Sequence, residues 1–223
     1  MEQEVRLNKF LSEAGVCSRR EADRMVEKGR ILVDGVPAQM GQKVRASQKI
    51  EVDHKRIQIE EEKVLLAFNK PRGIVCTTSK KDKDNIVDYI NYGKRIYPIG
   101  RLDKDSEGLI LLTNQGELVD KILRGSNYHE KEYIVTVNKK ITPEFLRAMG
   151  SGVPILDTVT RTCELEQIGP RTFRIILTQG LNRQIRRMCE YFSYRVIELT
   201  RVRVMNIRLG RLKSGTYRKI VGK

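Results

Sequence analysis

The sequence has no tryptophan and only two histidines and four cysteines among its 223 residues. Neither histidine lies near a cysteine, and the cysteines are widely spaced, at Cys17, Cys76, Cys163 and Cys189. This spacing does not fit a zinc site, so we expect no bound metal. Scattered cysteines are typical of reduced thiols in a cytosolic protein.

The chain also lacks an apolar run long enough to cross a membrane, and residues 1–6 contain no apolar stretch that could act as a signal peptide. It has no glycine motif of a nucleotide-binding loop. We therefore expect a soluble cytoplasmic protein that needs no cofactor and does not bind membranes.

Acidic residues are under-represented, with 28 Asp and Glu against 43 Lys and Arg, a net charge of +15. A protein this basic usually binds a polyanion, although a merely basic surface is an alternative. No basic amphipathic helix carries Trp or Phe on its apolar face, so nucleic acid is favoured over membrane. Hydrophobic residues make up 39% of the chain, enough for a packed core.

Residues 5–52 read as a small helical unit. Leu7, Phe10 and Leu11 share one helical face, Ser18 opens a second helix with capping-box spacing, and residues 31–37 predict a short strand and turn. The motifs at 6–11, 17–22 and 31–35 resemble an S4 domain, an RNA-binding module. That resemblance implies phosphate contacts by cations on the two helices, which we assign to Arg6, Lys9, Arg19 and Arg20.

We divide the chain into residues 1–60, which include a linker from residue 55, and a second domain at 61–223. Apolar runs predict strands at 64–69, 109–113, 132–137, 172–177 and 203–207. Capping signals predict helices that open at Asn114, Thr142 and Asn182. The mixture predicts an α+β domain on a mixed, largely antiparallel sheet.

Three motifs of the second domain carry polar groups that could do chemistry. The first, at 69–73, reads as a strand end and turn, although Lys70 could touch RNA. The second, at 100–109, places Asp103 beside Arg101. The third, at 180–188, predicts a helix on which Arg186 borders the apolar face, while Arg183 and Arg187 face solvent.

The segment 97–112 resembles the catalytic loop of pseudouridine synthases, above all of the RsuA-type family, and the resemblance spans nearly the whole chain. It implies that Asp103 is the catalytic carboxylate, that Arg186 forms an ion pair with it, and that Tyr133 stacks on the target uracil. Arg101 would fill the space vacated by the flipped base or bind the RNA backbone. Asp105 is interpreted as part of the loop structure or as solvent-facing, and Arg183 and Arg187 as RNA contacts.

The implied activity is the isomerisation of a specific uridine in RNA to pseudouridine, with Asp103 acting as nucleophile or as base. The stretches 127–133 and 179–184 are most similar to F-type enzymes, which act on 23S ribosomal RNA of the large subunit. The partner expected is therefore ribosomal RNA, with tRNA as an alternative substrate, and the protein is expected to be a monomer. Two other readings are a non-catalytic S4-type RNA-binding protein and a glycosidase, which lacks a convincing second acid.

Overall fold

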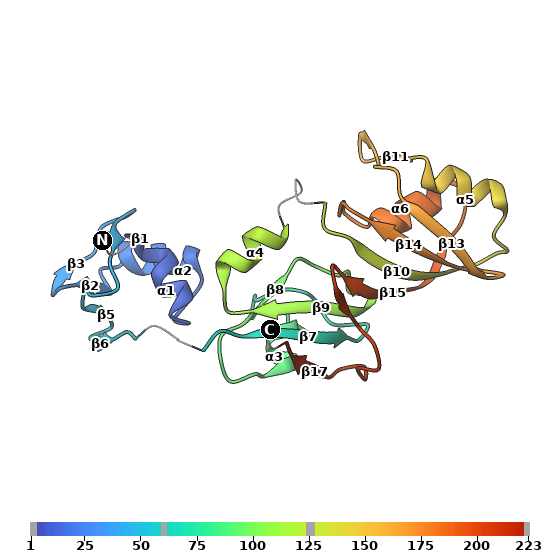
Figure 1. Cartoon of the computed structure of the whole chain (residues 1–223). Helices are drawn as coiled ribbons and strands as arrows, with labels where there is room; N and C mark the ends of the chain where they lie inside the picture. Colours follow the sequence, from blue (N-terminus) through green and yellow to red (C-terminus); the bar gives the residue numbers. More distant parts are fainter. Residues whose placement is uncertain (1–3, 59–61, 124–127, 221–223) are drawn as a thin grey trace. The chain divides into compact units, whose positions relative to one another are not determined.

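The computed structural model describes residues 4–58, 62–123 and 128–220. Of the expected linker, residues 59–61 lie outside these ranges. The chain divides into two compact units, described separately below (Figure 1). The first comprises residues 1–64 with 92–96 and 114–116, and the second contains the rest.

The N-terminal unit packs two helices on short strands. Its helices are α1 (Leu7–Glu13) and α2 (Arg19–Glu27). Its strands are β1 (Val5–Arg6), β2 (Ile31–Val33), β3 (Val36–Pro37), β4 (Lys43–Val44), β5 (Ile50–Val52) and β6 (Lys55–Arg56), with β3-β2-β5-β6 forming one sheet and β1-β4 another. The expected cap is present, since Ser18 Oγ accepts from the Glu21 N–H at 3.2 Å. Leu11 and Ile31 are fully buried between helices and sheet.

The second unit is built on one mixed sheet, which has nine strands within the described residues. The strands are β7 (Leu65–Lys70), β8 (Tyr97–Ile99), β9 (Glu107–Thr113), β10 (Lys131–Val137), β13 (Glu164–Gly169), β14 (Thr172–Leu177), β15 (Val196–Val204), β16 (Ile207–Arg208) and β17 (Tyr217–Lys219). Their main order is β13-β14-β10-β15-β9-β7-β17, with β16 beside β15 and β8 beside β9. Among the described strands of this sheet the pairing is antiparallel except between β15 and β9.

Helices and a small hairpin flank this sheet (Figure 1). The helices are α3 (Ile86–Ile90), α4 (Gly116–Leu123), α5 (Pro143–Gly150) and α6 (Gln184–Tyr191), and the hairpin pairs β11 (Pro154–Ile155) with β12 (Thr158–Val159). Thr142 caps α5 as expected, accepting from the Phe145 N–H at 3.2 Å. None of the helices in the described ranges has both the length and the apolar character that crossing a bilayer demands.

The last long strand differs from the expectation. A strand was predicted at 203–207, whereas β15 covers Val196–Val204 and residue 207 belongs to β16. Charged residues interrupt the apolar pattern of β15. A register shift against β10 lies between Arg201 and Arg203, so their side chains lie on opposite faces of the sheet although they are two residues apart. Both guanidinium groups have hydrogen-bond partners, Arg201 on the Leu109 carbonyl and Arg203 on Glu132. Satisfied cations of this kind are compatible with a central strand, although composition alone argues against one.

The register of β10 decides which side chains face the same way. Lys131 and Tyr133 lie two residues apart, so they share a face, and Glu132 lies on the opposite one. Tyr133 is the Cα partner of Arg201 on β15, whereas Glu132 is the partner of Arg203. The Glu132–Arg203 pair, with Oε2 2.6 Å from Nε, holds the strands together on one side of a register shift, and beyond that shift Tyr133 lies beside Arg201.

Gly108 lies where β9 meets β15, opposite Arg201 in the parallel pairing. Its φ is +104°, and a Cβ at this position would lie 2.7 Å from the Arg201 backbone nitrogen and closer still to the carbonyl oxygen. Both features require glycine, because an L side chain is strained at this φ and would collide with rigid backbone. Gly108 thus allows the approach of β15 to the strand that follows the Asp103 loop.

We expect Gly108→Ala to lower the free energy of unfolding by about 3 kcal/mol or more, since strain and overpacking add. Gly210→Ala is the matched control: its φ is +60° and no atom lies within 4 Å of the added Cβ, so its cost should stay near the 1–2 kcal/mol of left-handed backbone. Urea denaturation of both variants measures the difference. Equal destabilisation would show that the close contact with β15 is unimportant.

Candidate active site

A cavity of about 400 Å³ opens in the second unit. Its walls come from the loop between β8 and β9, strand β10, the end of β14 with the loop that follows, and β15. The residues that matter below are Arg101, Asp103, Lys131, Tyr133, Arg183, Arg186 and Arg201. Pockets of about 300–1,000 Å³ are usual for small molecules, so this one can hold a single nucleoside.

The loop that carries Asp103 is tied down along its length. The Ser106 N–H donates to the Asp103 carbonyl at 3.1 Å, and the Gly73 N–H donates to the Lys104 carbonyl at 2.8 Å. Leu102 is buried, and its N–H donates to Cys76 Sγ at 3.4 Å. With its neighbour held inside, the Asp103 side chain projects outward and is 34% exposed, at the edge of the cavity.

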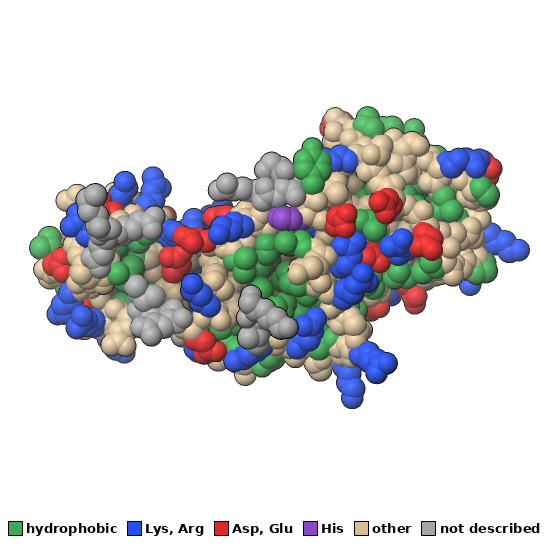
Figure 2. Space-filling model, viewed as in Figure 1, with side chains coloured by type: hydrophobic (Ala, Val, Ile, Leu, Met, Phe, Trp, Pro, Cys, Tyr) green, Lys and Arg blue, Asp and Glu red, His purple; other side chains and the backbone are tan. Residues whose placement is uncertain are grey.

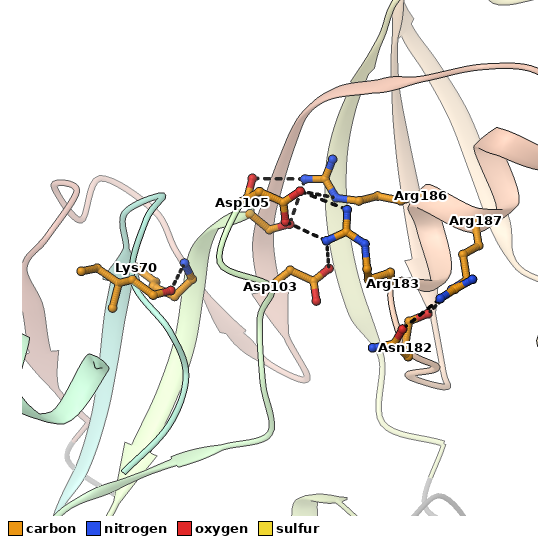
Figure 3. Close-up of polar contacts among 9 residues, drawn as sticks. Lys70, Asp103, Asp105, Asn182, Arg183, Arg186 and Arg187 are labelled. Atoms are coloured by element: carbon orange, nitrogen blue, oxygen red, sulfur yellow. Dashed lines mark hydrogen bonds and ion pairs between the residues drawn. The ribbon is translucent and has the colours of Figure 1, made fainter. Parts of the chain in front are cut away.

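Two arginines meet two aspartates beside this loop (Figure 3). Arg183 holds both carboxylate oxygens of Asp105 at 3.1 Å, and its Nη1 lies 3.8 Å from Asp103 Oδ2. Arg186 Nε lies 3.4 Å from Asp105 Oδ2. Asp105 therefore bridges the two guanidinium groups, and one of these also faces Asp103.

This arrangement corrects two sequence-based assignments. Arg186 was expected to pair with Asp103 and instead pairs with Asp105, and Arg183 was expected to face solvent and RNA and instead reaches both aspartates. Asp105, interpreted as loop structure or as solvent-facing, is 49% exposed, and its two ion pairs tie the loop to these arginines.

The physical reason is where α6 begins. Asn182 was expected to cap the helix, but α6 starts at Gln184, and the residue before it, Arg183, has left-handed backbone with φ of 50°. The Asn182 side chain instead accepts from Arg187 Nη2 at 3.3 Å. Helical periodicity therefore does not apply to Arg183, whose side chain lies beside the Asp103 loop.

The ionised form of Asp105 is strongly favoured. Partial burial raises the pKa of its carboxyl, but the hydrogen bonds from Arg183 and the charges of Arg186 and Arg183 outweigh burial, so the pKa lies below its ordinary value. The same hydrogen bonds raise the pKa of Arg183. Asp105 and Arg183 thus stay charged throughout the neutral range.

Arg186 holds the loop backbone as well as Asp105. Its Nη2 donates to the Asp105 carbonyl at 3.1 Å and to Ser106 Oγ at 3.2 Å, and its side chain is only 9% exposed. Its Nε is buried and makes no hydrogen bond within the described residues, so the ion pair with Asp105 is the interaction that compensates it. Arg186 therefore fixes the segment that directly follows the Asp103 turn.

Strands β10 and β15 contribute an aromatic and cationic part of the cavity lining. Tyr133 is 9% exposed and lines the cavity together with Lys131 and Arg201. Arg201 is buried and is held by the Leu109 carbonyl, 2.6 Å from its Nε. Neither Lys131 nor Arg201 was singled out from the sequence. Lys131 could have been found from its spacing of two from Tyr133 on a strand, whereas Arg201 lay outside the predicted strands.

Lys70, expected to contact RNA, is fully buried at the end of β7. Its Nζ donates to the Pro71 and Ile74 carbonyls, each at 2.9 Å, and burial lowers its pKa (Figure 3). Because its ammonium group is buried and bonded to two backbone carbonyls, Lys70 cannot reach a phosphate. The assignment to RNA is wrong, and Lys70 supports the turn of the 69–73 motif.

The remaining cations predicted to bind RNA lie nearer the surface. Arg101, Arg6, Arg19 and Arg20 are exposed, and Arg187 is partly exposed. Lys9 is partly exposed and forms an ion pair with Glu13 at 3.7 Å. Figure 2 shows Lys and Arg side chains on both units. Among the described residues, no three His, Cys, Asp or Glu side chains cluster so as to hold a metal ion.

Comparison with known proteins gives this geometry its context. Residues 64–191 match the family model for RNA pseudouridylate synthase, and residues 5–50 match the S4 domain. The chain belongs to the RNA pseudouridylate synthase family. It is an RsuA-type pseudouridine synthase with an N-terminal S4 domain, as the sequence motifs predicted, and hence an isomerase. The non-catalytic reading of the chain is set aside.

The similarity extends over nearly the whole chain. The dual-specificity RNA pseudouridine synthase RluF of Salmonella typhi is 56% identical over 218 residues, which cover 97% of this chain and 75% of that protein. The ribosomal large subunit pseudouridine synthase B of Bacillus subtilis is 35% identical over 96% of this chain and 91% of that one. A pseudouridylate synthase of known crystal structure has 25% identity and a TM-score of 0.71, covering 97% of this synthase and 96% of that chain.

We expect Arg186→Ala to slow turnover about 100-fold, because a small displacement of a reacting group costs this much, while RNA affinity changes little. Arg187→Ala on the same helix is the control: Arg187 bonds only to Asn182 among the described residues, so turnover should persist. Single-turnover rates and RNA dissociation constants separate the two effects. An equal loss of rate and affinity in Arg186→Ala would contradict its role in holding the loop.

Proposed function

We propose that this synthase converts a specific uridine of 23S ribosomal RNA to pseudouridine, with Asp103 as the catalytic carboxylate. The observation that supports this most directly is the position of Asp103, partly exposed at the edge of a nucleoside-sized cavity that Tyr133 also lines. A carboxylate and an aromatic ring facing one cavity suit a sugar and a base, respectively.

The target uridine must leave its stack to enter the cavity, since no side chain reaches C1′ of a stacked nucleotide at close range. Arg101 is exposed and lines the cavity. We assign to it the role of filling the position that the uridine leaves in the RNA helix, or of binding the adjacent RNA backbone. Tyr133 then holds the uracil by stacking, an interaction that tolerates rotation of the base in its own plane. Rotation is required, because C5 must replace N1 at C1′.

Asp103 acts on the ribose as nucleophile or as base. In either route the carboxylate must be ionised and aimed at the sugar. Arg183, 3.8 Å away, is the ionic partner of this carboxylate, and Arg186 holds the following residues of the loop. We therefore assign Arg186 a positioning role through the loop, and Arg183 the direct ionic contact.

The choice of RNA rests on the relatives. One relative is named a ribosomal large subunit synthase, which supports 23S ribosomal RNA, and the RluF relatives are named dual-specificity enzymes, which supports a second substrate such as tRNA. Cations of the S4 domain and of α6 would neutralise phosphates and make affinity fall with salt. We assign these contacts to Arg6, Lys9, Arg19, Arg20 and Arg187.

Two further properties follow from this proposal. Ribosomal RNA is modified in the cytoplasm, and we place the enzyme there. We also propose that the enzyme acts as a monomer.

The chemistry is tested with RNA tritiated at uracil C5. The wild-type enzyme should release tritium from 23S transcripts into water, since C5 loses its hydrogen when it bonds to C1′. Asp103→Asn should reduce release by about 10⁴-fold or more while still binding RNA, as expected when the reacting group is removed. Asp105→Asn is the matched control and should keep measurable release. Full activity in Asp103→Asn would refute the assignment.

The target is tested by mapping pseudouridines in cells. A strain without the gene should lack one modified position in 23S ribosomal RNA, and the wild-type gene should restore it whereas Asp103→Asn should not. Parallel mapping of tRNA decides whether a second substrate exists. A loss confined to small-subunit RNA would show that the proposed substrate is wrong.

A further inference from the structure

Lys131 places a charge in the cavity that the mechanism above does not use. It is the first residue of β10, two residues before Tyr133 and therefore on the same face of the sheet. Both side chains line the cavity, as does Arg201, whose Cα pairs with that of Tyr133 across β15. A uracil held against Tyr133 would consequently lie near two cations, Lys131 and Arg201.

The ammonium of Lys131 has no counter-ion in the parts of the chain that the structure describes. Its side chain is half-buried, and the carboxylates on either side of it in the chain, Glu130 and Glu132, both pair with Arg203, at 2.9 Å and 2.6 Å. Burial lowers the pKa of Lys131, and the charge of Arg201 lowers it further. An unpaired and partly desolvated cation is costly, so its retention at this position calls for an anionic partner.

We propose that Lys131 is a further catalytic residue, which binds the uracil and stabilises the negative charge that the base carries once its bond to the ribose has broken. This inference rests on the roles proposed above for Asp103 and Tyr133. Arg201, fixed by the Leu109 carbonyl at 2.6 Å, contributes a second positive charge that cannot move away.

The electron count of the reaction requires such a group. When the C1′–N1 bond breaks, both electrons go to the base, which becomes a uracil anion with charge shared among N1, O2 and O4. The base turns, C5 forms the new bond to C1′, and the hydrogen of C5 leaves as a proton while N1 gains one. The intermediate anion exists whether Asp103 acts as nucleophile or as base, so the need for a cation is independent of that choice.

A phosphate of the RNA backbone is the competing partner for Lys131. The position favours the base, because Lys131 shares a strand face with Tyr133 and is partly desolvated, whereas phosphates stay hydrated at the mouth of a cavity. Fixed charges aimed at the atom where charge develops typically contribute about 10²–10³-fold to rate. A phosphate contact would contribute to affinity and to its dependence on salt instead.

The test compares Lys131→Met and Lys131→Arg in the full-length enzyme. Lys131→Met should slow single-turnover tritium release at saturating RNA by about 100-fold, and Lys131→Arg should restore most of that rate. The RNA dissociation constant should change by less than about fivefold, the effect of one screened charge. Lys140→Met, at an exposed lysine of the same unit, is the control and should leave rate and affinity unchanged.

Three outcomes would overturn the inference. An unchanged saturating rate with weaker binding and a shallower salt dependence would make Lys131 a phosphate contact. A lower melting temperature with equal loss of rate in both Lys131 variants would make its role structural. Wild-type rate and affinity in both variants would leave Lys131 without a role. Failure of the underlying mechanism is a separate result, since it would appear as activity in Asp103→Asn.

Discussion

The ionic contact between the Asp103 loop and the start of α6 is the interaction on which the active site depends. Residues 101–106 contain no regular structure, so their carboxylates are aimed by partners outside the loop. Arg183 and Arg186 provide these partners, and Asp105 connects the two guanidinium groups. Asp105 therefore has a role of its own: it fixes the arginine that faces Asp103. Without this cluster, the reacting carboxylate would be held only by backbone turns.

The sheet brings the other half of the site to the same cavity. The parallel pairing of β9 with β15 requires Gly108, and Glu132 and Arg203 hold β10 against β15 on the opposite face. The register shift beside that pair brings Tyr133 next to Arg201, whose Nη1 lies 3.5 Å from the Arg101 carbonyl of the Asp103 loop. The cavity thus contains a carboxylate with its cations and an aromatic ring flanked by lysine and arginine.

Much of this could be predicted from the sequence, where local chemistry decides the structure. The caps at Ser18 and Thr142, the apolar strands β7, β9, β10 and β14, and the family itself were all predicted from short patterns, and they are confirmed. Long-range geometry was harder. A helix that begins one residue later than expected changed the assignments of Arg183 and Arg186, because helical periodicity does not apply to a residue with left-handed backbone such as Arg183.

Buried charges were the other source of error. Lys70 looked like a surface cation because the sequence does not show that two backbone carbonyls surround its ammonium group. Only the last residues of β15 were predicted as strand, because arginines interrupt the apolar pattern that is typical of a central strand. Arg201 lies in the part of β15 that was not predicted, so it was not identified as a site residue. In each of these cases a polar group is satisfied by backbone or by a residue distant in sequence, which composition and periodicity do not report.

A crystal structure of the Asp103→Asn enzyme bound to RNA containing its target uridine would test the central claim most directly. The account predicts that the uridine is flipped into the cavity, with its base on the Tyr133 ring, the ribose facing residue 103, and Arg183 and Arg186 still joined through Asp105. A target uridine bound outside this cavity, or a ribose turned away from residue 103, would contradict it.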